Sequence, residues 1–184
     1  MCIRDRGTMD LRLATLADLN ACLSLSHHCM TDHVWQMKVN STQSRVDVGF
    51  DEVRLPRRMR ASYPRDLQQL VEDWHRDEGF IVAEVDGEVR GYVDVIAQPW
   101  QELGWVTNLA VDRAYRRRKI GIALMHRAGQ WAQEQGLEAL VVEATTKHYP
   151  ALCLYQKLGF QFCGFNDHYY TNQDIALFFV QRLR

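Results

Sequence analysis

The sequence predicts one α/β or α+β domain built on a sheet of about seven strands flanked by helices. Three strand-like runs form a meander over residues 80–111, and the dipeptide Asp86-Gly87 between the first two is a strong hairpin signal. A helical stripe at 120–132 then precedes the apolar run 140–142. This order indicates a right-handed crossover between parallel strands at 105–111 and 139–144.

The first half of the chain begins with a short strand at Leu11 to Ala14. Thr15 follows as the N-cap of a helix that reaches Leu25. Residues 33–62 are less regular, because Val46 to Phe50 alternate as in a strand while Pro56 among arginines predicts a turn. Leu67, Leu70, Val71 and Trp74 give residues 63–77 helical spacing.

The second half is more regular, and both its helices end at a glycine. The expected strands are 80–85, 89–96, 105–111, 140–142, 160–165 and 175–183, and the expected helices are 120–132, before Gly136, and 151–158, after Pro150 and before Gly159. The unbroken apolar run at 140–142 is typical of a strand covered on both faces.

Composition excludes several classes of protein. The 184 residues carry 22 basic and 23 acidic side chains, a net charge of −1, which gives no general attraction to nucleic acid or to an anionic membrane. No apolar run approaches the roughly 18–20 residues of a membrane span. The five cysteines form no CxxC pair and are odd in number, so we expect a reduced, cytoplasmic protein. We also expect Met9 as the natural start, with residues 1–8 a non-native or disordered leader and 9–184 the domain.

A basic loop connects the strand at 105–111 to the helix at 120–132. Arg116, Arg117, Arg118 and Lys119 are consecutive cations at a helix start, where the helix dipole favours anions. A bound phosphate would remove this conflict, because backbone N–H groups, the arginines and the close approach allowed by Gly121 would all serve an anion. A solvated basic turn is the alternative.

Residues 109–121, Leu-Ala-Val-Asp-Arg-Ala-Tyr-Arg-Arg-Arg-Lys-Ile-Gly, resemble motif A of the GNAT superfamily of N-acetyltransferases. That motif reads Arg/Gln-x-x-Gly-x-Gly/Ala, and Arg116 and Gly121 match its first and last positions. Lys119 replaces the middle glycine, and a helical φ would accommodate it. In another register Arg118, Gly121 and Ala123 match in full, at a less suitable distance from the strand.

A second stretch, Ala151-x-x-x-Tyr155-x-x-x-Gly159-Phe160, is similar to motif B of the same family. Together the motifs imply a single GNAT-like domain with a mixed, mostly antiparallel sheet. They imply direct attack of an amine on acetyl-CoA. Tyr155 matches the family's general-acid tyrosine, which protonates the departing thiolate, whereas its helical stripe also suits a core aromatic.

Glu143 ends the apolar run and resembles a glutamate that related N-terminal acetyltransferases use as a base, through water. Desolvation there would raise its pKa toward a useful value. A strand-end carboxylate that binds the sheet or the cation of the substrate is the alternative. Some relatives instead carry an acid on the preceding strand, where this chain has Thr107 and Asn108.

The resemblance also implies how acetyl-CoA is held. Leu109, Ala110 and Val111 would pair with the pantetheine arm like an added strand, and one N–H there would face the thioester oxygen. The pyrophosphate would lie on the loop and helix start, formed by Arg116, Arg117, Arg118, Lys119, Ile120, Gly121, Ile122 and Ala123. His148 stands where relatives often have an asparagine that touches the cofactor.

Two subfamilies compete for the acceptor. Asn108 to Val111, Glu143 and Phe162 to Phe165 are similar to streptothricin-type antibiotic acetyltransferases, whose substrate is a small-molecule amine. Tyr169-Tyr170 before Asp174-Ile175-Ala176 resembles ribosomal-protein N-terminal acetyltransferases. A non-catalytic acyl-CoA-binding module is a further alternative, and a nucleic-acid binder ranks last.

The region 33–62 corresponds in the family to a helix–loop–helix that shapes the amine pocket, with Trp35, Asp47, Asp51 and Glu52 as candidate lining residues. His27, His28 and His33 lack the spacing of a metal site, and direct acyl transfer needs no metal.

Family members are often dimers, so a homodimer through the C-terminal strands is a further hypothesis. Phe178 and Phe179 would then point to opposite faces of a strand.

Overall fold

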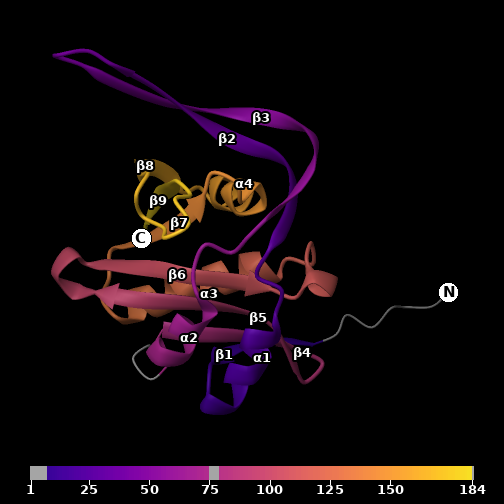
Figure 1. The fold of residues 1–184 in the computed structure, drawn as a ribbon. Helices are drawn as coiled ribbons and strands as arrows, with labels where there is room; N and C mark the ends of the chain where they lie inside the picture. Colours follow the sequence, from indigo (N-terminus) through magenta and orange to yellow (C-terminus); the bar gives the residue numbers. More distant parts are fainter. Residues whose placement is uncertain (1–7, 75–78, 184) are drawn as a thin grey trace. The chain divides into compact units, whose positions relative to one another are not determined.

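A computed structural model of the chain describes residues 8–74 and 79–183, so most of the expected leader lies outside the described residues. Seven strands form one sheet within these ranges, as predicted (Figure 1). In sheet order they are β1 (Met9–Leu13), β4 (Gly79–Val85), β5 (Glu88–Gln98), β6 (Leu103–Val111), β7 (Ala139–Thr145), β9 (Ala176–Arg182) and β8 (Gln161–Asn166). The pairs β1–β4, β4–β5 and β5–β6 are antiparallel, and β6–β7 is parallel. None of the helices in the described ranges has the length and apolar character to span a bilayer.

The helices also follow the prediction, although residues 75–77, the expected end of the second helix, lie outside the described residues. They are α1 (Leu19–Ser24), α2 (Leu67–Asp73), α3 (Ile120–Glu134) and α4 (Tyr149–Lys157), with short 3₁₀ turns at Leu16–Asp18, Pro99–Gln101 and Arg113–Tyr115. The chain divides into two units, and β7 and β9 each contribute to both. The first comprises Met1–His27, Asp66–Val142 and Val180–Arg184, and the second comprises His28–Arg65 and Glu143–Phe179.

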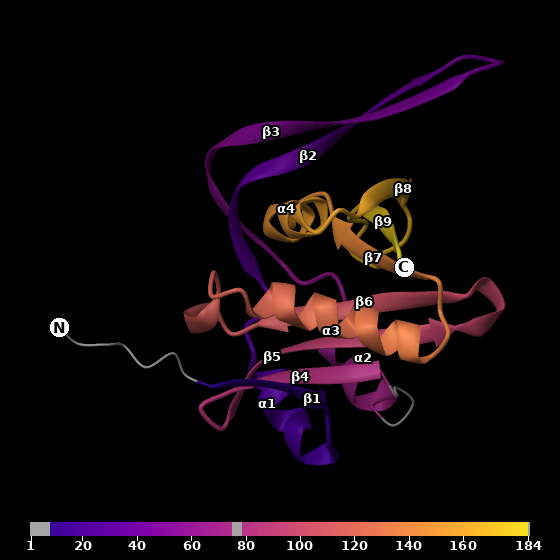
Figure 2. The same cartoon turned by 180° about the vertical axis from the view of Figure 1, so that it is seen from behind.

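In the first unit, helices cover both faces of the strands. Cys22 of α1 and Leu70 of α2 join Phe80, Val82 and Tyr92 in one buried cluster. Helix α3 packs on β4, β5 and β6 from the opposite side (Figure 2). Side chains along β4 point alternately to the two faces of the sheet, and helices cover both faces. Both sets of side chains are therefore buried, which explains the continuous apolar run of this strand.

Two glycines of the first unit have defined structural reasons. Gly87 follows Asp86 in the β4–β5 turn, where φ values of 81° and 53° match a type I′ hairpin. Gly91 faces α3, because a Cβ there would lie 3.2 Å from side-chain carbons of Ile120 and Leu124. The helix can thus lie close to the sheet only over a residue without a side chain.

In the second unit, residues 29–61 form a long two-stranded hairpin of β2 (Cys29–Ser41) and β3 (Val46–Ala61). The helix–loop–helix implied for this region is therefore wrong, and so is the turn at Pro56. Thr31 pairs with Met59 while His33 pairs with Arg54, so Pro56 lies in a bulge within β3. A bulge tolerates proline because the missing N–H is not needed for the ladder.

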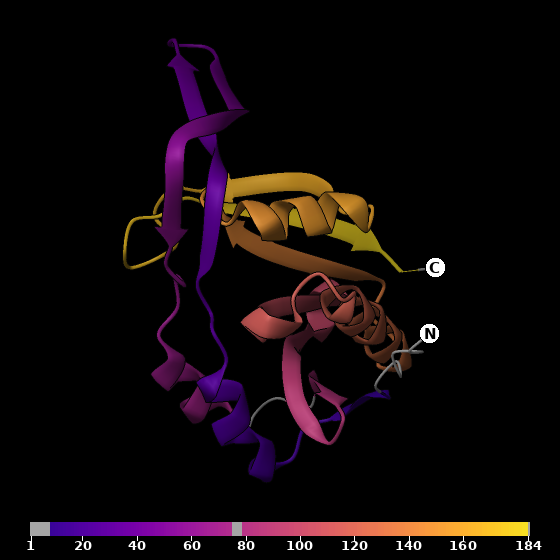
Figure 3. The ribbon, with the colours of Figure 1, turned by 90° about the vertical axis from the view of Figure 1, so that its right-hand side faces the viewer.

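Aromatic side chains hold this hairpin to the rest of its unit. Phe50 of β3 contacts Phe162 and Phe165 of β8 at ring-centroid distances of 5.8 and 5.4 Å. Trp35 of β2 contacts Phe179 of β9, and its backbone N–H donates to the Thr146 carbonyl. Strand β2 also passes α4 (Figure 3). A two-stranded hairpin alone is marginal in water, so these contacts stabilise it.

A half-buried ion-pair cluster fixes the start of the first unit. The Arg12 guanidinium donates to both carboxylate oxygens of Asp18 at 2.8 and 2.9 Å and also to Glu84. Asp18 also accepts the backbone N–H of Thr15 at 2.7 Å, which closes the predicted N-cap. The hydrogen bonds from Arg12 lower the pKa of Asp18 from 3.8 to about 2.

This depressed pKa predicts an acid-sensitive contribution to stability. Asp18 contributes its stabilisation above pH 3.8 and loses it as the pH falls through about 2. Asp18→Asn should lower the free energy of unfolding at pH 7 by about 2 kcal/mol and flatten its fall between about pH 4 and pH 2. Urea unfolding at a series of pH values measures both, with the exposed Asp10→Asn as control. An unchanged pH profile in Asp18→Asn would contradict this assignment.

Candidate active site

The C-terminal part of strand β6, in the first unit, turns one backbone edge away from β5. The parallel ladder of β6 with β7 runs from Leu103–Ala139 to Val106–Val142, whereas its ladder with β5 continues to Val111. The Asp112 N–H donates to the Arg90 carbonyl at 2.7 Å. Because bonded and non-bonded residues alternate in an antiparallel pair, Leu109 and Val111 direct their N–H groups away from β5. This edge can accept an extended ligand as an added strand.

The loop after β6 is built from charge and ring contacts. Asp112 caps the 3₁₀ turn by accepting the Ala114 N–H, and it pairs with Arg90 at 2.9 Å. The guanidinium groups of Arg90 and Arg118 lie 4.4 and 4.7 Å from the centre of the Tyr115 ring. The tyrosine thus holds two cations close together, an arrangement that favours binding of an anion nearby.

Arg116 is directed into its own unit. Its Nε donates to the Val111 carbonyl at 3.0 Å and its Nη2 to the Ser26 carbonyl at 2.6 Å. These bonds fix the loop against the end of β6 and the segment after α1. Arg117, Arg118 and Lys119 are exposed instead. A solvent-borne phosphate can reach these three cations.

The backbone at Lys119 differs from the helical conformation expected for it. Lys119 has φ of 67° and Arg117 has φ of 66°, both in the left-handed region that favours glycine. Lys119 is the N-cap of α3, and the Ala123 N–H donates to its carbonyl at 3.0 Å. The first-turn N–H groups of α3, those of Ile120, Gly121 and Ile122, precede that bond and can serve an anion. Lys119 therefore adopts the left-handed backbone conformation that glycine usually occupies.

In the second unit, Glu143 lies at the centre of a buried polar cluster. It is on β7, where every residue is buried, and its side chain is 3% exposed. Its carboxylate accepts an ion-pairing hydrogen bond from Arg65 and hydrogen bonds from the hydroxyl groups of Tyr169 and Tyr170 at 2.8 and 3.2 Å. Three donors from outside β7 thus converge on one buried charge.

The partners of Glu143 are themselves shifted by this environment. Burial and the charge of Glu143 raise the pKa of Tyr169 to about 12 and raise the pKa of Tyr170 well above its ordinary value. Burial opposes the charge of Arg65, but the Glu143 carboxylate outweighs it and raises the pKa of the guanidinium. Both phenols therefore stay protonated at neutral pH and act toward Glu143 as donors.

Tyr155 lies on the buried side of α4 in the same unit. It is 4% exposed, and its ring contacts Phe160 and Phe179. Its hydroxyl donates to the backbone carbonyl of Glu143 at 3.4 Å. Burial, followed by the charge of Glu143, raises the pKa of Tyr155, so the phenol carries its proton at neutral pH.

Sequence reasoning missed Arg65, which has no local motif and lies 78 residues before its partner. His148 is the N-cap of α4 and accepts the Ala151 N–H through its carbonyl. The acids of the hairpin, Asp47 and Asp51, form exposed ion pairs with Arg45 and Lys38. Across the described ranges, no three His, Cys, Asp or Glu side chains group as a metal site would require.

The comparisons with known proteins decide the family. Residues 50–160 match the model of the acetyltransferase (GNAT) family, which is more than half of the chain. The chain belongs to this family. Its fold also matches the crystal structure of nourseothricin acetyltransferase, with a TM-score of 0.80 at 24% identity over 96% of this chain and 99% of that one.

Two further similarities concern the same kind of protein. Over 91 residues the chain is 31% identical to streptothricin acetyltransferase of Streptomyces lavendulae, covering 50% of this chain and 48% of that protein. The chain thus spans about half the length of this curated relative. A Bacillus anthracis protein assigned as a streptothricin acetyltransferase, solved with acetyl coenzyme A, matches with a TM-score of 0.74 at 17% identity over 95% of this chain and 99% of that one.

The left-handed conformation of Lys119 gives a stability prediction. Lys119→Gly should raise the free energy of unfolding by about 0.5–1 kcal/mol relative to Lys119→Ala, because alanine keeps the Cβ that disfavours this conformation. Urea unfolding of the two variants measures the difference. A glycine variant that is less stable than the alanine variant would contradict the left-handed backbone at this position.

Proposed function

We propose that the protein transfers an acetyl group from acetyl-CoA to a primary amine of a small cationic molecule. The observation that supports this proposal is the Glu143 cluster, which lies beside the buried Tyr155 hydroxyl. The chain that holds it belongs to the GNAT family. A carboxylate and a protonated phenol within one unit supply the two proton-handling groups that amide formation from a thioester needs.

The residues of the first unit fit acetyl-CoA. The outward N–H group of Val111 suits an amide carbonyl of the pantetheine arm, which would add to β6 as a strand does. Arg117, Arg118, Lys119 and the first turn of α3 suit the pyrophosphate. When bound, acetyl-CoA supplies the activated acetyl group.

The bonds and protons that the reaction exchanges can be assigned to these groups. The neutral amine nitrogen forms a bond to the acetyl carbon, the carbon–sulfur bond breaks, and the thiolate leaves. The nitrogen loses one proton, directly or through water, toward Glu143, and the thiolate gains one from Tyr155. Tyr155 suits this role because its raised pKa keeps the phenol protonated until a thiolate forms.

The Tyr169 ring suits a cationic acceptor. Arg65 already shows how a planar cation lies here, 6.0 Å from the centre of that ring. Because Tyr169 is 38% exposed, an ammonium group of the acceptor can bind the same ring. A streptothricin-type antibiotic with several amines fits this chemistry, and the similar proteins described above are streptothricin and nourseothricin acetyltransferases.

The test is release of CoA from acetyl-CoA, followed with a thiol reagent across streptothricin, polyamines, lysine derivatives and short peptides. We expect turnover with streptothricin or another polyamine. Tyr155→Phe should lower kcat about 100-fold, because it removes only the proton donor. Its loss of stability should stay near 1 kcal/mol, the usual value of one hydrogen bond.

Tyr149→Phe is the matched control, because it makes the same change on the same helix and should leave kcat within about twofold. Preference for short peptides would instead favour the ribosomal-protein type of acetyltransferase. Tight acetyl-CoA binding without CoA release on any amine would contradict the proposal and favour a non-catalytic acyl-CoA-binding module.

A further inference from the structure

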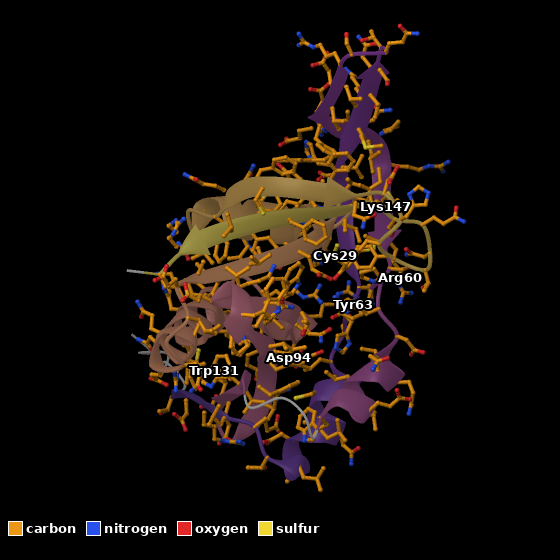
Figure 4. All side chains as sticks on the ribbon, turned by 90° about the vertical axis from the view of Figure 1, so that its left-hand side faces the viewer. Cys29, Arg60, Tyr63, Asp94, Trp131 and Lys147 are labelled. Atoms are coloured by element: carbon orange, nitrogen blue, oxygen red, sulfur yellow. The ribbon has the colours of Figure 1, made fainter. Side chains whose placement is uncertain are left out.

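Asp94 is a buried carboxylate on β5 of the first unit, labelled in Figure 4. It is 2% exposed and lies within the apolar run of that strand. Its Oδ2 accepts the Thr107 hydroxyl at 2.9 Å and the Asn108 side-chain amide at 3.1 Å. The two donors also lie 3.3 Å from one another, so the three side chains form a closed triangle.

This triangle coincides with a bulge in the sheet. Asn108 pairs with Asp94 and Val106 pairs with Val95, so Thr107 is an extra residue in β6. In a regular strand, neighbouring side chains such as those of Thr107 and Asn108 point to opposite faces. The bulge turns both toward one oxygen of Asp94, and the two hydrogen bonds in turn hold the bulge.

The bulge sets the direction of the backbone groups that follow it. Because side chains and N–H groups alternate with a period of two, one extra residue reverses which groups face β5. With Thr107 inserted, the Leu109 N–H points away from β5. Without it, the same N–H would turn toward β5 and be lost to a ligand.

We infer that Asp94 is a positioning residue: it fixes the Thr107–Asn108 bulge and so directs the Leu109 N–H at the carbonyl oxygen of a bound thioester. The inference rests on the proposed function, in which negative charge develops on that oxygen as the amine attacks. A fixed N–H donor at this position stabilises the developing charge. In this proposal Asp94, on the neighbouring strand β5, contacts neither acetyl-CoA nor the amine and acts only through the bulge of β6.

Two matched pairs of variants test this. Asp94→Asn keeps an acceptor oxygen for the two donors and Asp94→Ala removes it, while Thr107→Ser keeps the hydroxyl and Thr107→Val removes it at constant volume. Asp94→Ala and Thr107→Val should lower kcat about 10- to 100-fold, less than loss of the N–H donor itself. Their KM for acetyl-CoA and for the amine should stay within about twofold, and Asp94→Asn and Thr107→Ser should keep kcat within about threefold.

A measurement without turnover makes the result independent of the acceptor. In the wild type, acetyl-CoA should shift the backbone amide signal of Leu109 in a ¹H–¹⁵N spectrum, and CoA, which lacks the thioester carbonyl, should not. In folded Asp94→Ala the acetyl-dependent shift should be lost. If the wild type acetylates no amine yet shows this shift and its loss, the proposed function fails and the inference stands.

Three results would overturn the inference. One is a Leu109 amide that responds equally to acetyl-CoA and CoA in the wild type. Another is a folded Asp94→Ala variant with wild-type kcat and an intact shift. The third is Asp94→Asn as impaired as Asp94→Ala beside an unimpaired Thr107→Val, because the charge of Asp94 and not the bulge would then matter.

Discussion

The Glu143 carboxylate is the point at which separate stretches of the second unit meet. Burying a carboxylate is costly unless a cation and hydrogen-bond donors compensate it. Arg65, which follows the long hairpin, and Tyr169 and Tyr170, which precede β9, supply that compensation. The same contacts tie the hairpin and the C-terminal segment to β7. The packing of these stretches therefore depends on one buried charge, and the Tyr155 hydroxyl lies against the backbone of the same residue.

The first unit contains an irregular strand in its sheet. Strand β6 pairs with β5 up to Val111, and a bulge at Thr107, held by Asp94, interrupts this ladder. The loop that follows it keeps two non-glycine residues in the left-handed conformation. Contacts of Arg116 and Tyr115 stabilise this loop. Backbone irregularities thus gather where the proposed acetyl-CoA binds, as is common at functional sites.

Local sequence signals predicted the elements that depend on local chemistry. Asp86-Gly87 defined a hairpin, Thr15 a cap and Gly136 a helix end, where the Leu137 N–H donates to the Ala132 carbonyl. The hairpin at 29–61 escaped prediction because cross-strand pairs and ring contacts with β8 and β9 stabilise it, and Pro56 concealed it. Arg65 was missed because only the folded chain brings it to Glu143. An isolated acid in the apolar run of β5 was the available signal for Asp94.

The central claim is that Glu143 serves acetyl transfer as well as structure. Glu143→Gln should lower the free energy of unfolding by about 2 kcal/mol, because Arg65 loses its partner, and should lower kcat/KM for the amine about 100-fold. Adding Arg65→Gln removes the uncompensated charge, so the double variant should recover most of the stability while kcat/KM stays low. The measurement to make is kcat/KM of this stability-matched double variant. A value near that of the wild type would contradict the account and leave Glu143 with a structural role only.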